Sequence, residues 1–191
     1  MTLLAAVLIG AGLLACSGAQ ARGGHPVPGP ATSSLLRLRC SDSAGQQARG
    51  NQKVVRGVEG LLPGSRDVAS LYPIRASDGK RYFVYKAFLA VSASAAPFAT
   101  VSVTRPAGAR LVYGSSSRIG ELMSAPSGQA LVAASRTRVR LPVCGPRFTG
   151  FVGGIIVTRP ACVAFSVSSP SLLAAAVSVP IGPARCGASS P

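Results

Sequence analysis

The chain of 191 residues contains no tryptophan, only five acidic residues and a single histidine. General acid–base catalysis needs titratable side chains gathered in a pocket, and this chain offers few of them. An enzyme of this kind would need a deep pocket that holds at least two of these residues. We instead predict that the protein is not an enzyme and has no catalytic residue. The candidate groups are Asp42, Glu59, Asp67, Asp78, Glu121 and His25.

Motifs of nucleophilic, metal and phosphate sites are missing or incomplete as well. No Gly-x-Ser-x-Gly motif occurs, although hydrolases of the nucleophile-elbow type carry one. The cysteines have neither Cys-x-x-Cys spacing nor a companion histidine, so we predict no metal ion. The glycine-rich segment Gly150–Val157 lacks the Lys-Ser or Lys-Thr of a phosphate loop, so we predict no cofactor there. Gly153-Gly154 instead indicates a β-bulge or a close backbone approach.

The N-terminal apolar run, Leu3–Ala15, is too short for a transmembrane helix, which needs about 20 residues. A run of this length is typical of a secretory signal peptide. Its end, Leu13-Leu14-Ala15-Cys16, resembles the lipobox of bacterial lipoproteins, which predicts a signal peptide over residues 1–15 and a lipid anchor on Cys16. The alternative is cleavage after Ala19-Gln20-Ala21. A signal peptide normally begins with Lys or Arg, whereas Met1-Thr2-Leu3 contains neither. This favours a natural start upstream of Met1.

Residues 16–34 are rich in Gly, Pro and Ser and contain few apolar side chains. Such a segment cannot bury enough apolar surface to fold, so we predict a flexible tether. His25 lies in this tether and is expected to be solvated. A single domain is expected over residues 35–187, followed by a short C-terminal tail over 188–191.

The domain shows the alternation of apolar and polar residues that is typical of half-buried β-strands. With 22 Gly, 15 Pro and 5% aromatic residues, the composition favours short strands, many turns and an aliphatic core. We predict an all-β fold: a single antiparallel β-sandwich of the immunoglobulin-like kind with seven to nine strands. The main expected strands are Leu35–Cys40, Lys53–Leu62, Arg81–Val91, Phe98–Thr104, Ala109–Tyr113, Ala130–Val143, Gly150–Val157, Val163–Val167 and Val177–Ile181.

Two local signals refine this picture. Asp78-Gly79 supplies the positive φ angles of a tight hairpin, so a strand should follow it. Ile119, Leu122 and Met123 have the spacing of a short amphipathic helix within Ser116–Ala125. We expect this one helix to be a structural crossover that covers one end of the sheets.

The domain contains four cysteines, Cys40, Cys144, Cys162 and Cys186. An even number in an exported chain predicts two disulfides and an oxidising compartment. Three pairings are possible. We favour Cys162 with Cys186, because a hairpin that turns near Leu172 brings Cys186 back across Cys162, and then Cys40 with Cys144.

The net charge of +15 is typical of proteins that meet polyanions. Arg136, Arg138 and Arg140 alternate with apolar residues and should face outward, and Arg147 follows them. The arginines lie on expected strands without interleaved aromatics, so we expect no nucleic acid partner. Anionic lipids or acidic wall polymers are the candidate partners, and a merely solvated basic face is the alternative.

The segments LYPIR, ASDGKRYFVYKAFLAV, RIGELM, LPVCG, FTGFVGGIIVTRPACV and IGPARC resemble those of small exported proteins of unknown function from high-GC actinobacteria. The similarity covers most of Leu35–Cys186 and consists of glycines, prolines and cysteines that shape a fold. It implies an exported protein and supplies no site residues.

These observations predict a non-catalytic protein of the cell envelope with a binding or scaffolding role. It would be exported, either to the outer face of the cytoplasmic membrane through the lipid on Cys16 or to the extracellular space. The first alternative is a specific polyanion binder that uses the arginines named above. The second alternative is a secreted enzyme of an unrecognised type.

Overall fold

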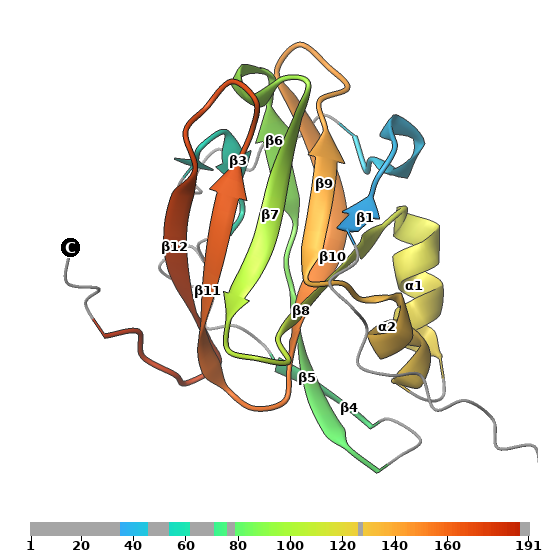
Figure 1. Ribbon diagram of the computed structural model, residues 1–191. Coiled ribbons are helices and arrows are strands. Elements are labelled where there is room, and N and C mark those ends of the chain that lie inside the picture. Colours follow the sequence, from blue (N-terminus) through green and yellow to red (C-terminus); the bar gives the residue numbers. More distant parts are fainter. Residues whose placement is uncertain (1–34, 46–53, 62–70, 76–78, 126–127, 188–191) are drawn as a thin grey trace, which may run out of the picture. The chain divides into compact units, whose positions relative to one another are not determined.

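The computed structural model describes residues 35–45, 54–61, 71–75, 79–125 and 128–187. In this part of the chain two β-sheets pack face to face (Figure 1), which confirms the all-β sandwich. The predicted signal peptide, the predicted tether and the predicted C-terminal tail lie outside the described residues, as do Cys16, His25, Asp67 and Asp78.

The first sheet has five strands in the order β1-β9-β7-β11-β12. Their bounds are Leu35–Arg37, Arg138–Pro142, Phe98–Arg105, Ala161–Ser168 and Ala175–Ile181. Neighbours in this sheet are antiparallel except β1 and β9, which run parallel. The prediction of a purely antiparallel sandwich is therefore wrong at this edge, where a first strand of three residues pairs with a late one.

The second sheet has seven strands and is centred on β10, Phe148–Val157. One side of β10 pairs with β5 and β6 in a single register, so the two form the nearly continuous strand expected over Arg81–Val91. β8 pairs with the other side, and β4, β3 and β2 extend the sheet beyond β5 and β6. The bounds of β2, β3, β4, β5, β6 and β8 are Val54–Val55, Val58–Glu59, Leu71–Arg75, Arg81–Lys86, Leu89–Ser92 and Arg110–Gly114.

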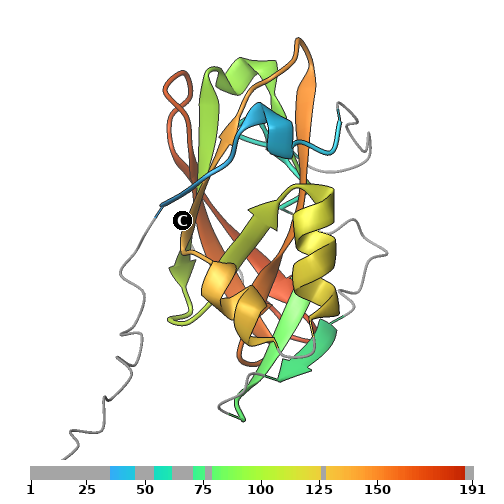
Figure 2. The same ribbon diagram turned by 90° about the vertical axis from the view of Figure 1, so that its right-hand side faces the viewer.

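Two helices connect β8 of the second sheet to β9 of the first and lie against one side of the sandwich (Figure 2). Helix α1, Ser116–Ser124, confirms the expected helix, and Ser115 caps it by accepting a hydrogen bond from the Arg118 N–H. Helix α2, Gln129–Ala134, corrects the strand predicted over Ala130–Val143. Ala and Leu are strong helix formers, and the strand begins only where arginines alternate with apolar residues. At the junction Leu111 and Arg136 form an isolated antiparallel bridge between β8 and the approach to β9.

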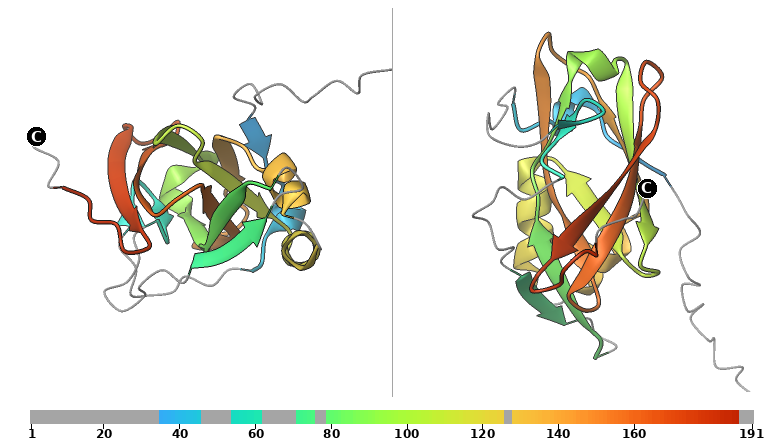
Figure 3. Two further views of the ribbon diagram at one scale, coloured as in Figure 1. Left: turned by 90° about the horizontal axis from the view of Figure 1, so that it is seen from below. Right: turned by 90° about the vertical axis from the view of Figure 1, so that its left-hand side faces the viewer.

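The main core lies between the two sheets (Figure 3) and is mainly aliphatic, as expected. Phe151 of β10 and Phe165 of β11 are fully buried within it. A second, smaller cluster lies on the opposite face of the second sheet. There α1 and α2 cover apolar side chains of β5, β8 and β10, and the buried members are Val84, Val112, Leu122, Leu131 and Ile156.

Of the two alternatives for the paired glycines of β10, the close backbone approach is confirmed and the β-bulge is wrong. β10 keeps one register with β8 and with β5 across Gly153 and Gly154. A Cβ on Gly153 would overlap the Val112 carbonyl oxygen and the Tyr113 ring, and one on Gly150 would overlap the Phe88 ring. The glycines therefore let neighbouring groups lie directly on the strand.

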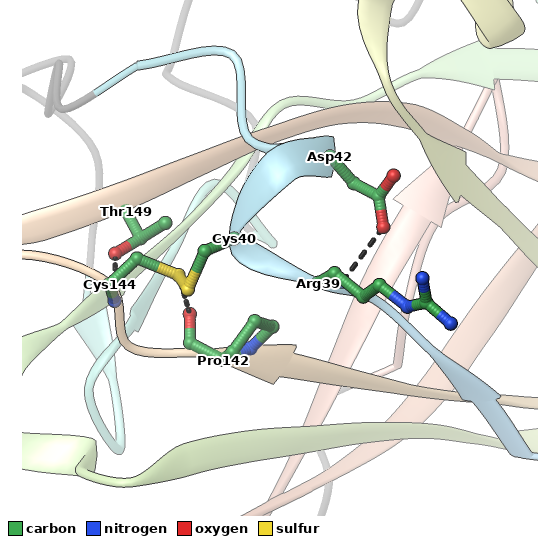
Figure 4. The surroundings of a disulfide bond; sticks show 6 residues. All are labelled: Arg39, Cys40, Asp42, Pro142, Cys144 and Thr149. Atoms are coloured by element: carbon green, nitrogen blue, oxygen red, sulfur yellow. Dashed lines mark hydrogen bonds between the residues drawn. A yellow bond between two sulfur atoms is a disulfide. The ribbon is translucent and has the colours of Figure 1, made fainter.

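Both disulfides of the favoured pairing are present in the structure. Cys40 and Cys144, whose Cα atoms are 5.6 Å apart, join the segment after β1 to the loop after β9 (Figure 4). Cys162 and Cys186, 5.2 Å apart at Cα, join β11 to the segment after β12. The strand expected over Leu35–Cys40 is shorter than predicted, so Cys40 does not lie on it. β1 ends at Arg37, and Cys40 begins a short 3-10 helix, Cys40–Asp42.

The two disulfides indicate that the protein folds in a non-reducing compartment, because thiols stay reduced in the cytosol. This supports export in general terms. None of the helices that the structure describes has the length and apolar character needed to span a membrane.

Candidate functional site

The outer surface of β1 and β9 carries three arginines side by side. The parallel register places Arg37 opposite Arg140 and Leu35 opposite Arg138. Val139 and Leu141 are fully buried against the core, so the alternation of a β-strand turns Arg138 and Arg140 to the other face. We call Arg37, Arg138 and Arg140 the arginine face.

Arg140 is held in place by an aromatic ring of the neighbouring strand. Its guanidinium carbon lies 4.0 Å from the centroid of the Phe98 ring, which is a cation–π geometry. The Nε atom is buried and has no hydrogen-bond partner among the described residues. Such stacking restricts the guanidinium before any ligand arrives, which lowers the entropy lost on binding.

Hydroxyl groups of β7 flank the arginine face. The antiparallel register of β7 with β9 places Thr100 beside Arg140 and Ser102 beside Arg138. Ser168 and Ser166 of β11 lie next in the same two rows. Thr100 is buried, so the hydroxyl groups that remain partly exposed beside the arginines are those of Ser102, Ser166 and Ser168. Arginine forks and hydroxyl groups both donate hydrogen bonds to oxyanions.

The four arginines proposed from the sequence do not form one cluster. Arg138 and Arg140 lie together, whereas Arg136 donates to the backbone carbonyls of Ala133 (2.6 Å) and Ser135 (2.7 Å). Arg136 thereby satisfies carbonyls at the C-terminus of α2, a structural role. Arg147 is exposed in the loop beyond the other end of β9. Arg37 completes the cluster, and sequence reasoning missed it because the parallel pairing that brings it there is not a local pattern.

The described acidic residues lie on three different elements. Asp42 accepts the Arg39 backbone N–H (2.8 Å) in the 3-10 helix, and Glu121 of α1 lies 3.4 Å from Arg118. Glu59 of β3 is buried, and its Oε2 atom has no partner among the described residues. No group of three or more His, Cys, Asp or Glu within the described ranges could hold a metal ion.

Ser77 and Lys80 have the Ser-x-x-Lys spacing of some acyl-transfer enzymes. In the chain the motif falls between the end of β4 at Arg75 and the start of β5 at Arg81. Ser77 itself is outside the described residues.

Tyr113 of β8 is a buried polar group in the main core. Its hydroxyl has no hydrogen-bond partner among the described residues. Burial, with a smaller contribution from Tyr85, raises the pKa of Tyr113 far above its usual value. The phenol therefore stays neutral at physiological pH and is unsuited to act as a base.

A groove of about 480 Å³ lies between α1 and the outer face of the second sheet. Its walls are mostly apolar, and Lys86 of β5 is the charged residue among the described residues that line it. Of the acidic residues that the structure describes, Asp42, Glu59 and Glu121, none lines it. The lining residues are Val84, Lys86, Ala87, Phe88, Val112, Ser116, Ile119, Gly120, Met123, Ser124, Val152 and Gly153.

Comparison of the chain with protein-family models, with curated proteins and with solved structures finds no match. The arguments for function therefore come from the residues themselves.

Proposed function

We propose that this chain is an exported, non-catalytic protein of the cell envelope that binds a phosphate-rich anionic surface through the arginine face. The observation that carries the proposal is the parallel register of β1 and β9, which sets Arg37 beside Arg140 and next to Arg138. Export is supported by the two disulfides. The lipid anchor on Cys16 and the position on the outer face of the cytoplasmic membrane form part of the same proposal.

The spacing of the arginine face suits a repeating anion. Neighbouring strands lie about 4.8 Å apart, and residues i and i+2 of one strand lie about 7 Å apart. Three guanidinium groups on that grid can contact several phosphates at once, whereas a single small anion would satisfy one or two. The net charge of +15 adds a long-range attraction that steers an anionic partner to the domain.

A lipid anchor would reinforce this binding. A chain tethered through Cys16 would hold the domain close to the membrane, which raises the effective concentration of lipid phosphate at the arginine face. Phosphate-containing wall polymers present the same chemistry, so both sources belong in the test.

The test compares the full chain with the triple variant Arg37→Gln, Arg138→Gln and Arg140→Gln. The control variant carries Arg81→Gln, Arg159→Gln and Arg185→Gln, three exposed arginines elsewhere in the domain, so both variants lose the same charge. Binding is measured to phosphatidylglycerol vesicles, to phosphatidylcholine vesicles and to soluble polyphosphate. The Cys16→Ser background is used throughout, so that the anchor cannot contribute.

We expect the arginine-face variant to lose about tenfold or more in affinity for the anionic probes, and the control to lose much less. Specific binding should also persist at about 0.5 M salt, where screening removes loose electrostatic attraction. Equal losses in the two variants would show that binding depends on total charge and would refute the role of this face. Preference for vesicles over polyphosphate would identify lipid as the source of the phosphate, and the reverse would identify a polymer.

A further inference from the structure

We propose that β12 of one molecule pairs with β12 of a second copy of this chain, so that the two five-stranded sheets join into one continuous sheet. β12 lies at the edge of its sheet, on the side away from α1 and α2 (Figure 1). This edge is separate from the arginine face, and the pairing does not depend on the proposed function.

β12 has less of the protection that edge strands usually carry. An open row of N–H and C=O groups pairs readily with other chains, so natural edges are short, charged or interrupted by proline. β1 and β2 have three and two residues, and β4 carries Pro73 and Arg75. β12 is seven residues long, and residues 160–184 around it contain no charged side chain. Within the described part of the chain, the backbone of β12 pairs with β11 alone.

Pro180 indicates which backbone groups of β12 are open. It pairs with Cys162 of β11, and a proline is tolerated in a paired strand where its nitrogen faces away from the neighbour. The direction alternates along a strand, so the N–H groups of Ala176 and Ser178 also face the open edge. These two residues are the donors available to a further strand, and Pro180 adds its carbonyl oxygen as an acceptor.

The chemistry of this edge selects its occupant. A partner must be extended, because the open groups are backbone donors and acceptors. It must also be uncharged along its length, because no side chain of β12 can neutralise a charge. β12 itself meets both requirements. A two-fold axis near Val177 sets Ala176 of each copy opposite Ser178 of the other, so each open N–H meets a carbonyl oxygen.

An exposed leucine adjoins the open edge. Leu173 precedes β12 by two residues and is 82% exposed. Its loop is held in place, because the Ser171 hydroxyl lies 2.8 Å from the Ser94 carbonyl oxygen and 3.3 Å from that of Ala96. In the two-fold register Leu173 lies opposite Ile181 of the other copy. Pairing therefore removes apolar surface from water in addition to satisfying the backbone.

The pairing has a consequence for the arginine face. Antiparallel pairing about a two-fold axis perpendicular to the sheet keeps the outer faces of both copies on the same side. The two arginine faces can then meet one anionic surface together, which raises the overall affinity. This consequence rests on the proposed function, whereas the pairing itself does not.

The test measures self-association of the full chain carrying Cys16→Ser by sedimentation velocity, without lipid or polymer, at protein concentrations up to about 1 mM. Ser178→Pro removes an open N–H that the fold does not use. Ser178→Ala is the matched control, because it removes the hydroxyl and keeps the N–H. Ala176→Lys places like charges near the two-fold axis. Circular dichroism melts establish that each variant is folded.

We expect a dimer whose dissociation constant rises about tenfold or more in Ser178→Pro and stays within about twofold in Ser178→Ala. Ala176→Lys should also weaken the dimer, and more so at low salt than at about 0.5 M, where screening reduces the repulsion. On dilution, the amides of Ala176 and Ser178 should lose protection from hydrogen exchange. Those of Val177 and Val179, which face β11, should keep it.

A chain that stays monomeric up to about 1 mM would overturn the proposal. A dimer of equal strength in the unsubstituted chain, Ser178→Pro and Ala176→Lys would also overturn it, because the copies would then associate through another surface. None of these outcomes involves an anionic probe, so this proposal and the proposed function fail separately.

Discussion

The two sheets of the sandwich differ in what covers their outer faces. The outer face of the five-stranded sheet carries arginines and serines that are exposed or half-buried, while Thr100 among them is buried. The seven-stranded sheet is apolar on both faces, and α1 and α2 cover the second one. Both disulfides lie in or directly beside strands of the first sheet. Covalent bonds thus support the sheet with less buried surface, and helices cover the sheet with more.

The largest expected effect concerns the disulfides. Replacing Cys40 and Cys144 by serine removes a link between residues 104 apart in sequence, and the chain-entropy model gives a loss of about 5 kcal/mol in the free energy of unfolding. The matched change at Cys162 and Cys186, a separation of 24, should cost about 3.5 kcal/mol. Guanidinium unfolding of the two paired variants measures the difference.

Amide hydrogen exchange then tests which sheet depends on the first disulfide. In the Cys40→Ser, Cys144→Ser variant we expect β1 and β9 to lose protection while β10 keeps it. If β10 loses protection first, the contrast between the two sheets is wrong.

An effect of intermediate size is expected when one side chain is shortened on the outer face of each sheet. Ile156 of β10 is fully buried under the helices, and Ile156→Ala should destabilise the domain by about 3 kcal/mol. Ser166→Ala on the outer face of β11 should change stability by less than about 0.5 kcal/mol. The urea unfolding midpoints of the two variants measure the stability that each one loses. Similar midpoints would mean that packing under the helices contributes little to the stability of the second sheet.

The smallest effect concerns the inner face of the second sheet. Tyr113→Phe removes a buried hydroxyl that has no partner among the described residues, so we expect stability to rise by about 1 kcal/mol. The same group makes stability depend on pH. Because the folded pKa is raised, the unfolded state releases the phenol proton first as the pH rises above about 10, and stability falls there.

The variant should weaken that alkaline loss, and denaturant titrations at pH 8 and pH 11 measure it. An unchanged slope between the two pH values would show that Tyr113 does not control it.

The sequence was informative where a strand alternates strictly. In β9 the order Arg138-Val139-Arg140-Leu141 indicates both the strand and its outward arginines. In β11 and β12 the matching parity of Val163 and Val179 predicts the final hairpin, in which they pair directly. That register explains why the cysteine pairing could be favoured in advance.

Other features depended on distant contacts that leave no local pattern. Arg37 joined the arginine face through a parallel pairing between segments about 100 residues apart. Helix α2 was missed because its apolar residues are followed almost directly by a strand. Over six residues the spacing of apolar side chains does not distinguish a helix from a strand. The groove depends on how α1 rests on the sheet, although Gly120 was visible as a glycine within the predicted helix.

The disulfide order has a consequence for biogenesis. The first domain cysteine pairs with the second and the third with the fourth, so no bond spans another along the chain. If the chain enters the oxidising compartment from its N-terminus, joining cysteines strictly in order of emergence yields the native bonds without any reshuffling. Cys16 would enter the compartment before these four cysteines. Acylation of its thiol would prevent it from forming a non-native disulfide with one of them.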